Sequence, residues 1–160
     1  MSLKKSLPWV GLALIAFVVG VVLVRRAPLG ILSQETLALP HVYAYKDWQS
    51  IGVQVDPGDR LYIRARGEWL YTPGEYHGPE GHRYYRAPNT YPISGIAGGV
   101  LLARVGDEGR IVTVGRGTSL VVEQTGTLYL RINDDILSDN EGFVTVEVEV
   151  ISPEDENTGY

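Results

Sequence analysis

At 160 residues, the chain has room for one membrane-spanning segment and one compact domain. Four of its 14 basic residues lie within the first 26 positions and all 19 acidic residues lie beyond them, so the remainder has ten basic residues and a net charge of −9. This acidic balance argues against nucleic acid as a partner, because binding to phosphates favours a basic surface. Cysteine is absent, which excludes disulfide bonds and a lipoprotein anchor.

Residues 7–24 form an apolar run without a charged side chain. As a helix, this run would span about 27 Å, close to the hydrocarbon thickness of a bilayer. An indole and two guanidinium groups suit the two membrane interfaces that flank such a run. We therefore predict a short tail at residues 1–6 and a transmembrane anchor at residues 7–26. The residues that mark this anchor are Trp9, Phe17, Arg25 and Arg26.

A cleaved signal peptide is the alternative for this segment, but the apolar core is long and no small-residue cleavage site follows it. We favour an uncleaved signal anchor that crosses the cell membrane once and contacts lipid. Two lysines precede the apolar run of residues 7–24 and two arginines follow it, so the positive-inside rule is nearly balanced. We expect a cytoplasmic N-terminus and a periplasmic or extracellular domain.

Residues 27–41 lack a clear hydrophobic period and are expected to form an extended tether. The pattern then becomes that of β-strands over residues 42–151, because apolar and polar side chains alternate. Three sets of apolar residues each share one face of a predicted strand: Leu61, Ile63 and Ala65; Leu128, Leu130 and Ile132; and Val144, Val146, Val148 and Val150.

Turn signals separate these strands at short intervals, for example Asp56-Pro57-Gly58-Asp59 and Gln124-Thr125-Gly126. No helical period long enough for a crossover lies between them. The pattern predicts an all-β fold, an antiparallel β-sandwich or jelly roll preceded by one transmembrane α-helix. Residues 152–160 are expected to form an acidic tail.

Motifs of the common enzyme classes are missing, so we expect no catalytic activity. The chain has three histidines, two of which, His77 and His82, lie close to Glu75 and Glu80. A zinc site is conceivable there. A polar, solvent-facing loop is the interpretation that we favour.

The segment 133–142 clusters hard oxygen donors between two predicted strands. Ca²⁺ binds six to eight such donors, and the side chains of Asp134, Asp139 and Asn140 could converge if the loop folds back. The spacing does not match an EF-hand. An ordinary Asp- and Asn-rich turn is an equally good interpretation of the spacing alone.

Several segments of residues 48–151 resemble the PA-I galactophilic lectin family in order and spacing. That family implies a small jelly-roll β-sandwich in which calcium bridges the protein and a galactose ring. The segments that carry the resemblance are Val55-Asp-Pro-Gly-Asp59, Arg66-Gly-Glu-Trp-Leu-Tyr71, Gly78-Pro-Glu-Gly81, Gly98-Gly-Val-Leu-Leu-Ala-Arg-Val-Gly106, Leu128-Tyr-Leu-Arg-Ile-Asn-Asp134 and Asp139-Asn-Glu-Gly142.

The resemblance implies a Ca²⁺ cofactor held by the side chains of Asp134, Asp139 and Asn140 and by the backbone carbonyl of Tyr71. A second loop carbonyl would come from Ile136 or its neighbour, although the loop is shorter than in the lectins. Asp139 stands where the family has asparagine, which keeps an oxygen donor and adds a charge.

The sugar contacts of the family differ in this chain. Tyr85 and Pro88 stand where the lectins have a histidine and a glutamine, and His82 replaces an aspartate. The rings of Tyr84, Tyr85 and Tyr91 could stack on a carbohydrate. The residues Arg83, Tyr84, Tyr85 and Arg86 form a Tyr- and Arg-rich loop whose composition is typical of a protein contact, which we favour.

Two functions follow. The favoured hypothesis is a non-catalytic single-pass subunit whose outward-facing domain docks on a larger membrane-protein complex, for example a respiratory or photosynthetic one. The alternative is a calcium-dependent carbohydrate-binding module displayed at the cell surface.

Overall fold

The computed structural model describes residues 39–72 and 74–153. The predicted tail at residues 1–6, the anchor at residues 7–26 with its four marker residues, and most of the tether lie outside the described residues. Within the described ranges, no helix has the length and apolar character needed to cross a membrane.

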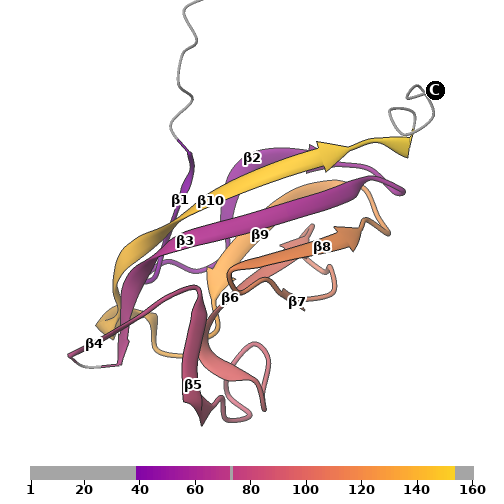
Figure 1. Ribbon diagram of the computed structural model, residues 1–160. Coiled ribbons are helices and arrows are strands. Elements are labelled where there is room, and N and C mark those ends of the chain that lie inside the picture. The colour runs from indigo at the N-terminus through magenta and orange to yellow at the C-terminus, as the bar shows by residue number, and fades with distance from the viewer. Residues whose placement is uncertain (1–38, 73, 154–160) are drawn as a thin grey trace, which may run out of the picture. The chain divides into compact units, whose positions relative to one another are not determined.

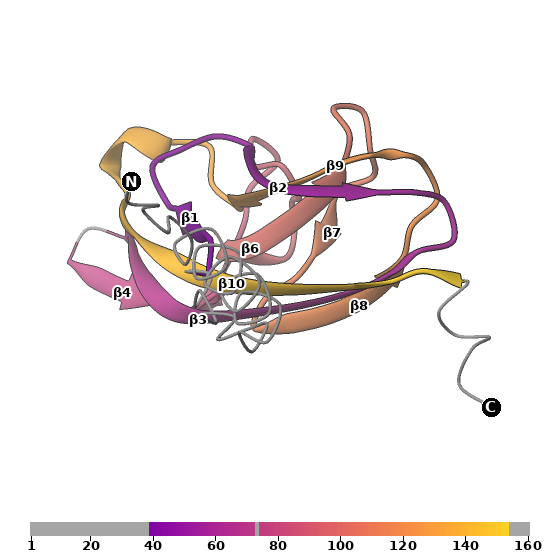
Figure 2. The same ribbon diagram turned by 90° about the horizontal axis from the view of Figure 1, so that it is seen from above.

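Two antiparallel sheets of five strands each form the domain and lie face to face (Figures 1 and 2). The first sheet has the order β1-β10-β3-β4, and β8 also pairs with β3. The second has the order β2-β9-β6-β5, and β7 also pairs with β6. The strands of the first sheet are β1 (His41–Tyr43), β3 (Arg60–Thr72), β4 (Glu75–His77), β8 (Gly117–Val121) and β10 (Glu141–Ile151). Those of the second are β2 (Gln49–Val55), β5 (Glu80–Arg86), β6 (Ala97–Val105), β7 (Val112–Thr113) and β9 (Gly126–Ile132).

The core lies between the sheets and contains the side chains that alternation predicts. The inward residues of β3 and β9 are all buried, as are Val144 and Val146 of β10. Val150 is an exception, because 38 % of its surface is exposed. Since β10 pairs with β1 only as far as Thr145, the second half of β10 has β3 as its one paired neighbour. Val150 therefore lies on the same face of β10 as Val144 and Val146 but outside the core.

Trp69 of β3 links the two sheets. Its side chain is fully buried, and its indole Nε1 donates a hydrogen bond to the carbonyl of Gly99 in β6 at 3.1 Å. A buried indole N–H needs such a partner, because an unpaired donor in the core is costly. This contact fixes the spacing of β3 and β6 close to the C-terminal end of β3.

We expect Val144→Ala to lower the free energy of unfolding by about 2–3 kcal/mol, because two buried methyl groups are lost and a cavity remains. Val150→Ala makes the same chemical change on the same face of β10, at an exposed position, and should cost less than about 1 kcal/mol. Urea unfolding followed by fluorescence measures both. Equal costs would contradict the assigned position of the core.

Candidate functional site

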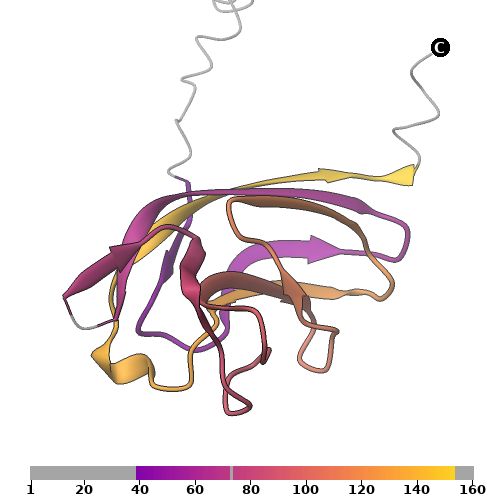
Figure 3. The same ribbon diagram turned by 60° about the horizontal axis from the view of Figure 1, so that its bottom comes forward.

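One end of the sandwich gathers β4, β5 and the loop between β9 and β10, which contains a short 3₁₀ turn, η1 (Leu137–Asp139) (Figure 3). A cavity of about 230 Å³ opens here. Three of the four candidate calcium residues and three of the six candidate contact residues meet around this cavity. Those that line it are Tyr71, His82, Tyr85, Tyr91, Asp134 and Asp139.

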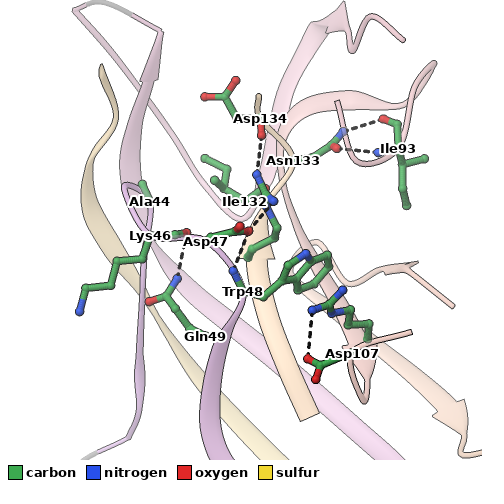
Figure 4. A network of polar contacts seen from close by, with 12 residues as sticks. Ala44, Lys46, Asp47, Trp48, Gln49, Ile93, Asp107, Ile132, Asn133 and Asp134 are labelled. Carbon is green, nitrogen blue, oxygen red and sulfur yellow. Dashed lines mark hydrogen bonds and ion pairs between the residues drawn. The ribbon is translucent and has the colours of Figure 1, made fainter. Parts of the chain in front are cut away.

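Asn133, at the end of β9, fastens one wall of this cavity. Its Oδ1 accepts a hydrogen bond from the amide of Ile93 at 3.0 Å, and its Nδ2 donates to the carbonyl of Ile93 at 2.9 Å and to that of Ala97 at 3.2 Å. Figure 4 shows the paired contact between Asn133 and Ile93. The fully buried Asn133 thus holds the connection between β5 and β6, which contains Tyr91, against β9.

The backbone of Asp134 is held by a second contact from β9. Arg131 Nη2 donates to the carbonyl of Asp134 at 2.7 Å, and its Nη1 pairs with the carboxylate of Asp47. Burial lowers the pKa of Arg131, while the charges of Asp47 and Asp134 oppose that shift. Asp47 and Asp134 lie around the same network in Figure 4.

Asp134 and Asn140, both buried, meet inside the loop. Asn140 Nδ2 donates to Asp134 Oδ2 at 2.7 Å and also lies 3.5 Å from the carbonyl of Ile136 and 3.4 Å from that of Ala44. Asn140 Oδ1, in contrast, is buried without a hydrogen-bond partner. An unpaired buried acceptor is costly, so this oxygen indicates a missing donor or cation.

These groups fit a calcium ion. Three oxygens, one from Asp134 and the carbonyls of Ile136 and Ala44, lie within 3.5 Å of Asn140 Nδ2, and Asn140 Oδ1 is a further oxygen donor without a partner. A group of oxygen donors of this kind suits Ca²⁺. The carbonyl of Ile136, which the resemblance implies as a candidate second loop carbonyl, lies 3.5 Å from Asn140 Nδ2.

Tyr71 and Asp139 are the other two predicted calcium ligands. Tyr71 lies at a register shift between Leu70 and Thr72 and has no Cα partner in the ladders of β3 with β10, β4 and β8. Asp139 lies on η1 with an exposed side chain that borders the cavity.

Two phenols form the floor of the cavity beside Asp134. The hydroxyl groups of Tyr71 and Tyr91 lie 3.0 Å apart. Burial raises the pKa of Tyr71 to about 12, helped by the charge of Asp134 and opposed by the hydrogen bond from Tyr91. Burial also raises the pKa of Tyr91, together with its hydrogen bonds to Tyr71 and Asp134. Both phenols are protonated at neutral pH, so each retains one hydrogen to donate.

The ring of Tyr71 occupies space that only glycine leaves open. A Cβ atom on Gly98 would lie 2.1 Å from Tyr71 Oη, and one on Gly99 would lie 2.7 Å from the ring. Real Cβ atoms do not approach other atoms this closely. The Gly98-Gly99 pair of β6 and Asn133 are thus structural residues of the site that the sequence-based ligand assignments omitted. The resemblance contained both, as parts of longer segments.

The Tyr- and Arg-rich segment was predicted to be a loop, but it forms most of strand β5. The pairing of β5 with β6 shifts register between His82 and Arg86. This shift lets both His82 and Tyr85, three residues apart, face the cavity. Tyr84 is 93 % exposed, and Arg83 and Arg86 are exposed as well.

His77 and His82 also depart from the favoured prediction of a solvent-facing loop. His77 ends β4 and His82 lies in β5, with only 17 % and 24 % of their side chains exposed. Both approach Glu75, whereas Glu80 pairs with Arg116 at 2.8 Å. Burial opposes ionisation of Glu80, but the hydrogen bond and charge of Arg116 prevail and lower its pKa.

A larger cavity of about 320 Å³ lies elsewhere, against β6, β8 and the turn that follows β8. It contains none of the predicted site residues. The smaller cavity is therefore the better candidate, because it combines convergent polar groups with aromatic walls.

No protein-family model matches the sequence, and no curated protein matches it. Among solved structures, the N-terminal domain of EclA, a PllA-like lectin, is similar. The two chains are 26 % identical, the match covers 70 % of this chain and 94 % of that chain, and the TM-score is 0.55. The chain therefore has a lectin-like, all-β fold, as the sequence predicted.

Proposed function

We propose that this domain is a non-catalytic, calcium-dependent carbohydrate-binding module of the PA-I lectin type. The observation that carries the proposal is that Asp134, which accepts a hydrogen bond from Asn140, lines one cavity together with the aromatic residues Tyr85 and Tyr91. The similarity to a PllA-like lectin supports it. This choice reverses the preference that the sequence alone suggested.

The parts of the cavity have separate roles in this proposal. Asp134, Asn140, Asp139 and the carbonyl of Tyr71 would hold the calcium, which supplies open coordination positions for sugar hydroxyl groups. The half-exposed ring of Tyr85 can stack on the apolar face of a sugar ring. A cavity of about 230 Å³ is smaller than most sites for drug-sized ligands, so it favours a single terminal sugar ring.

Calorimetry on the full chain in mild detergent tests this proposal. We expect calcium to bind first, and galactosides to bind only when calcium is present. Adding EGTA should abolish the heat signal of sugar binding, and adding excess calcium should restore it. A glycan array with and without calcium would then identify the preferred sugar. Calcium binding without any calcium-dependent glycan binding would reduce the ion to a structural role.

The other hypothesis, a subunit of a larger membrane complex, stays a prediction. Its main evidence is the anchor at residues 7–26, which lies outside the described residues. The described residues and the comparisons add no support to it. The predicted cell-membrane location is equally untested and is compatible with a surface lectin.

A further inference from the structure

Three nitrogen and oxygen donors converge beside the cavity, on strands β4 and β5. Glu75 Oε2 lies 3.5 Å from His77 Nε2 and 3.7 Å from His82 Nε2. All three donor atoms lie within 4.8 Å of one another. The two imidazole rings are 4.6 Å apart between centroids. This group is separate from the oxygen cluster at Asp134 and Asn140.

The local sequence brings these donors together for simple reasons. Glu75 and His77 are two residues apart on β4, so their side chains project from the same face of the strand. A tight turn, in which the amide of Gly81 donates to the carbonyl of Gly78 at 2.9 Å, then returns the chain so that His82 on β5 faces His77. Pro79 occupies the second position of that turn, where its fixed φ is favourable.

The backbone of the turn packs closely against β6. Gly81 has φ +71°, and a Cβ there would lie 2.4 Å from the carbonyl oxygen of Gly98. The two imidazoles are also packed: His77 lies edge-on to Tyr71 and His82 edge-on to Tyr85. Two of the three donors are therefore held in place before any ligand arrives, which lowers the entropic cost of binding.

The donor set matches a transition metal better than calcium. In a tetrahedral zinc site with bonds of about 2.0–2.1 Å, ligand atoms are about 3.3–3.5 Å apart. The observed separations of 3.5 and 3.7 Å from Glu75 to the histidines need little adjustment. Imidazole nitrogen suits Zn²⁺, Cu²⁺ and Ni²⁺, whereas Ca²⁺ prefers oxygen alone.

We propose that Glu75, His77 and His82 bind a divalent transition-metal ion, with Zn²⁺ as the reference case, at the rim of the carbohydrate cavity. Two neutral imidazoles and one carboxylate leave a fourth coordination position for water or a ligand. His82 contributes to both this site and the wall of the cavity. The proposal concerns a second ion and does not depend on sugar binding.

Two existing hydrogen bonds must change when the metal binds. His82 Nδ1 accepts from the amide of Tyr84 at 3.2 Å, and His77 Nε2 lies 3.2 Å from Thr72 Oγ1. Ligation through Nε2 of His82 requires the proton on its Nδ1, so the Tyr84 amide must donate its hydrogen bond to water instead. Tyr84 is 93 % exposed, which makes this exchange inexpensive. The hydroxyl of Thr72 can rotate away.

Zinc titration of the full chain, purified without a polyhistidine tag, tests the proposal. We expect saturable one-to-one binding by calorimetry that an excess of calcium does not displace. The chain has three histidines, so ¹⁵N-histidine spectra contain few signals. Zinc should shift the ring nitrogens of His77 and His82 to the metal-bound range and leave those of His41, which stacks on Phe143, unchanged.

His77→Gln, His82→Gln and Glu75→Gln should each weaken zinc binding by more than tenfold, whereas His41→Gln should not. Asp134→Asn should retain zinc binding, which distinguishes this site from the calcium site. The proposal is overturned if zinc does not saturate the wild-type chain, or if His41 responds while His77 and His82 do not. The wild-type spectra decide the matter even if a variant fails to fold.

Discussion

Asp134→Asn is expected to weaken calcium binding by more than 100-fold and to abolish calcium-dependent sugar binding. Asp134 is the buried carboxylate of the site, and it lies against Asn140 and the hydroxyl of Tyr91. The affinity of a calcium site depends strongly on the number of its charged ligands. Mutating a group that only contacts a metal ligand typically lowers metal affinity 10–100-fold. Removing the charge of a central ligand should therefore lower the calcium affinity by more than that.

Asparagine at this position keeps the size and an acceptor oxygen, so the fold should survive. Asp107→Asn is the matched control, because it makes the same change at a largely exposed carboxylate that does not line the cavity. Calorimetry with calcium, followed by sugar in the presence of calcium, measures both variants. Unaltered calcium affinity in the Asp134 variant would remove this residue from the ligand set.

Most of the fold could be predicted from the sequence, because alternation is a direct consequence of strand geometry. Leu61 and Ile63, or Leu130 and Ile132, face the core because successive side chains point to opposite faces. Val150 shows the limit of this rule. The period predicts which face a residue occupies, but not whether a neighbouring strand or sheet covers it there.

The site was predictable in its parts but not in its assembly. Asp134 and Asn140 are recognisable as oxygen donors from composition and resemblance. The approach of Glu75 to His77 and His82 depends on a turn, and the placing of Tyr85 at the cavity depends on a register shift. Neither leaves a periodic signal, so a loop was predicted where two strands occur.

Asn133→Ala is expected to lower the free energy of unfolding by about 2–4 kcal/mol. The change leaves the amide and carbonyl of Ile93 and the carbonyl of Ala97 without their partner. Each buried unpaired group costs about 1–3 kcal/mol, and water can recover part of that because Ile93 and Ala97 are only half-buried. Asn89→Ala, an exposed change on the connection that Asn133 holds, should cost less than about 0.5 kcal/mol.

The Asn133→Ala variant also distinguishes the sugar-contacting part of the site from the calcium-binding part. Asn133 holds the segment that contains Tyr91, whereas the contact between Asp134 and Asn140 does not pass through its side chain. Sugar affinity should therefore fall more than calcium affinity. Hydrogen exchange should accelerate at residues 87–96 while the amides of β10 stay protected. Equal losses of both affinities with unchanged exchange would mean that Asn133 acts on the calcium loop directly.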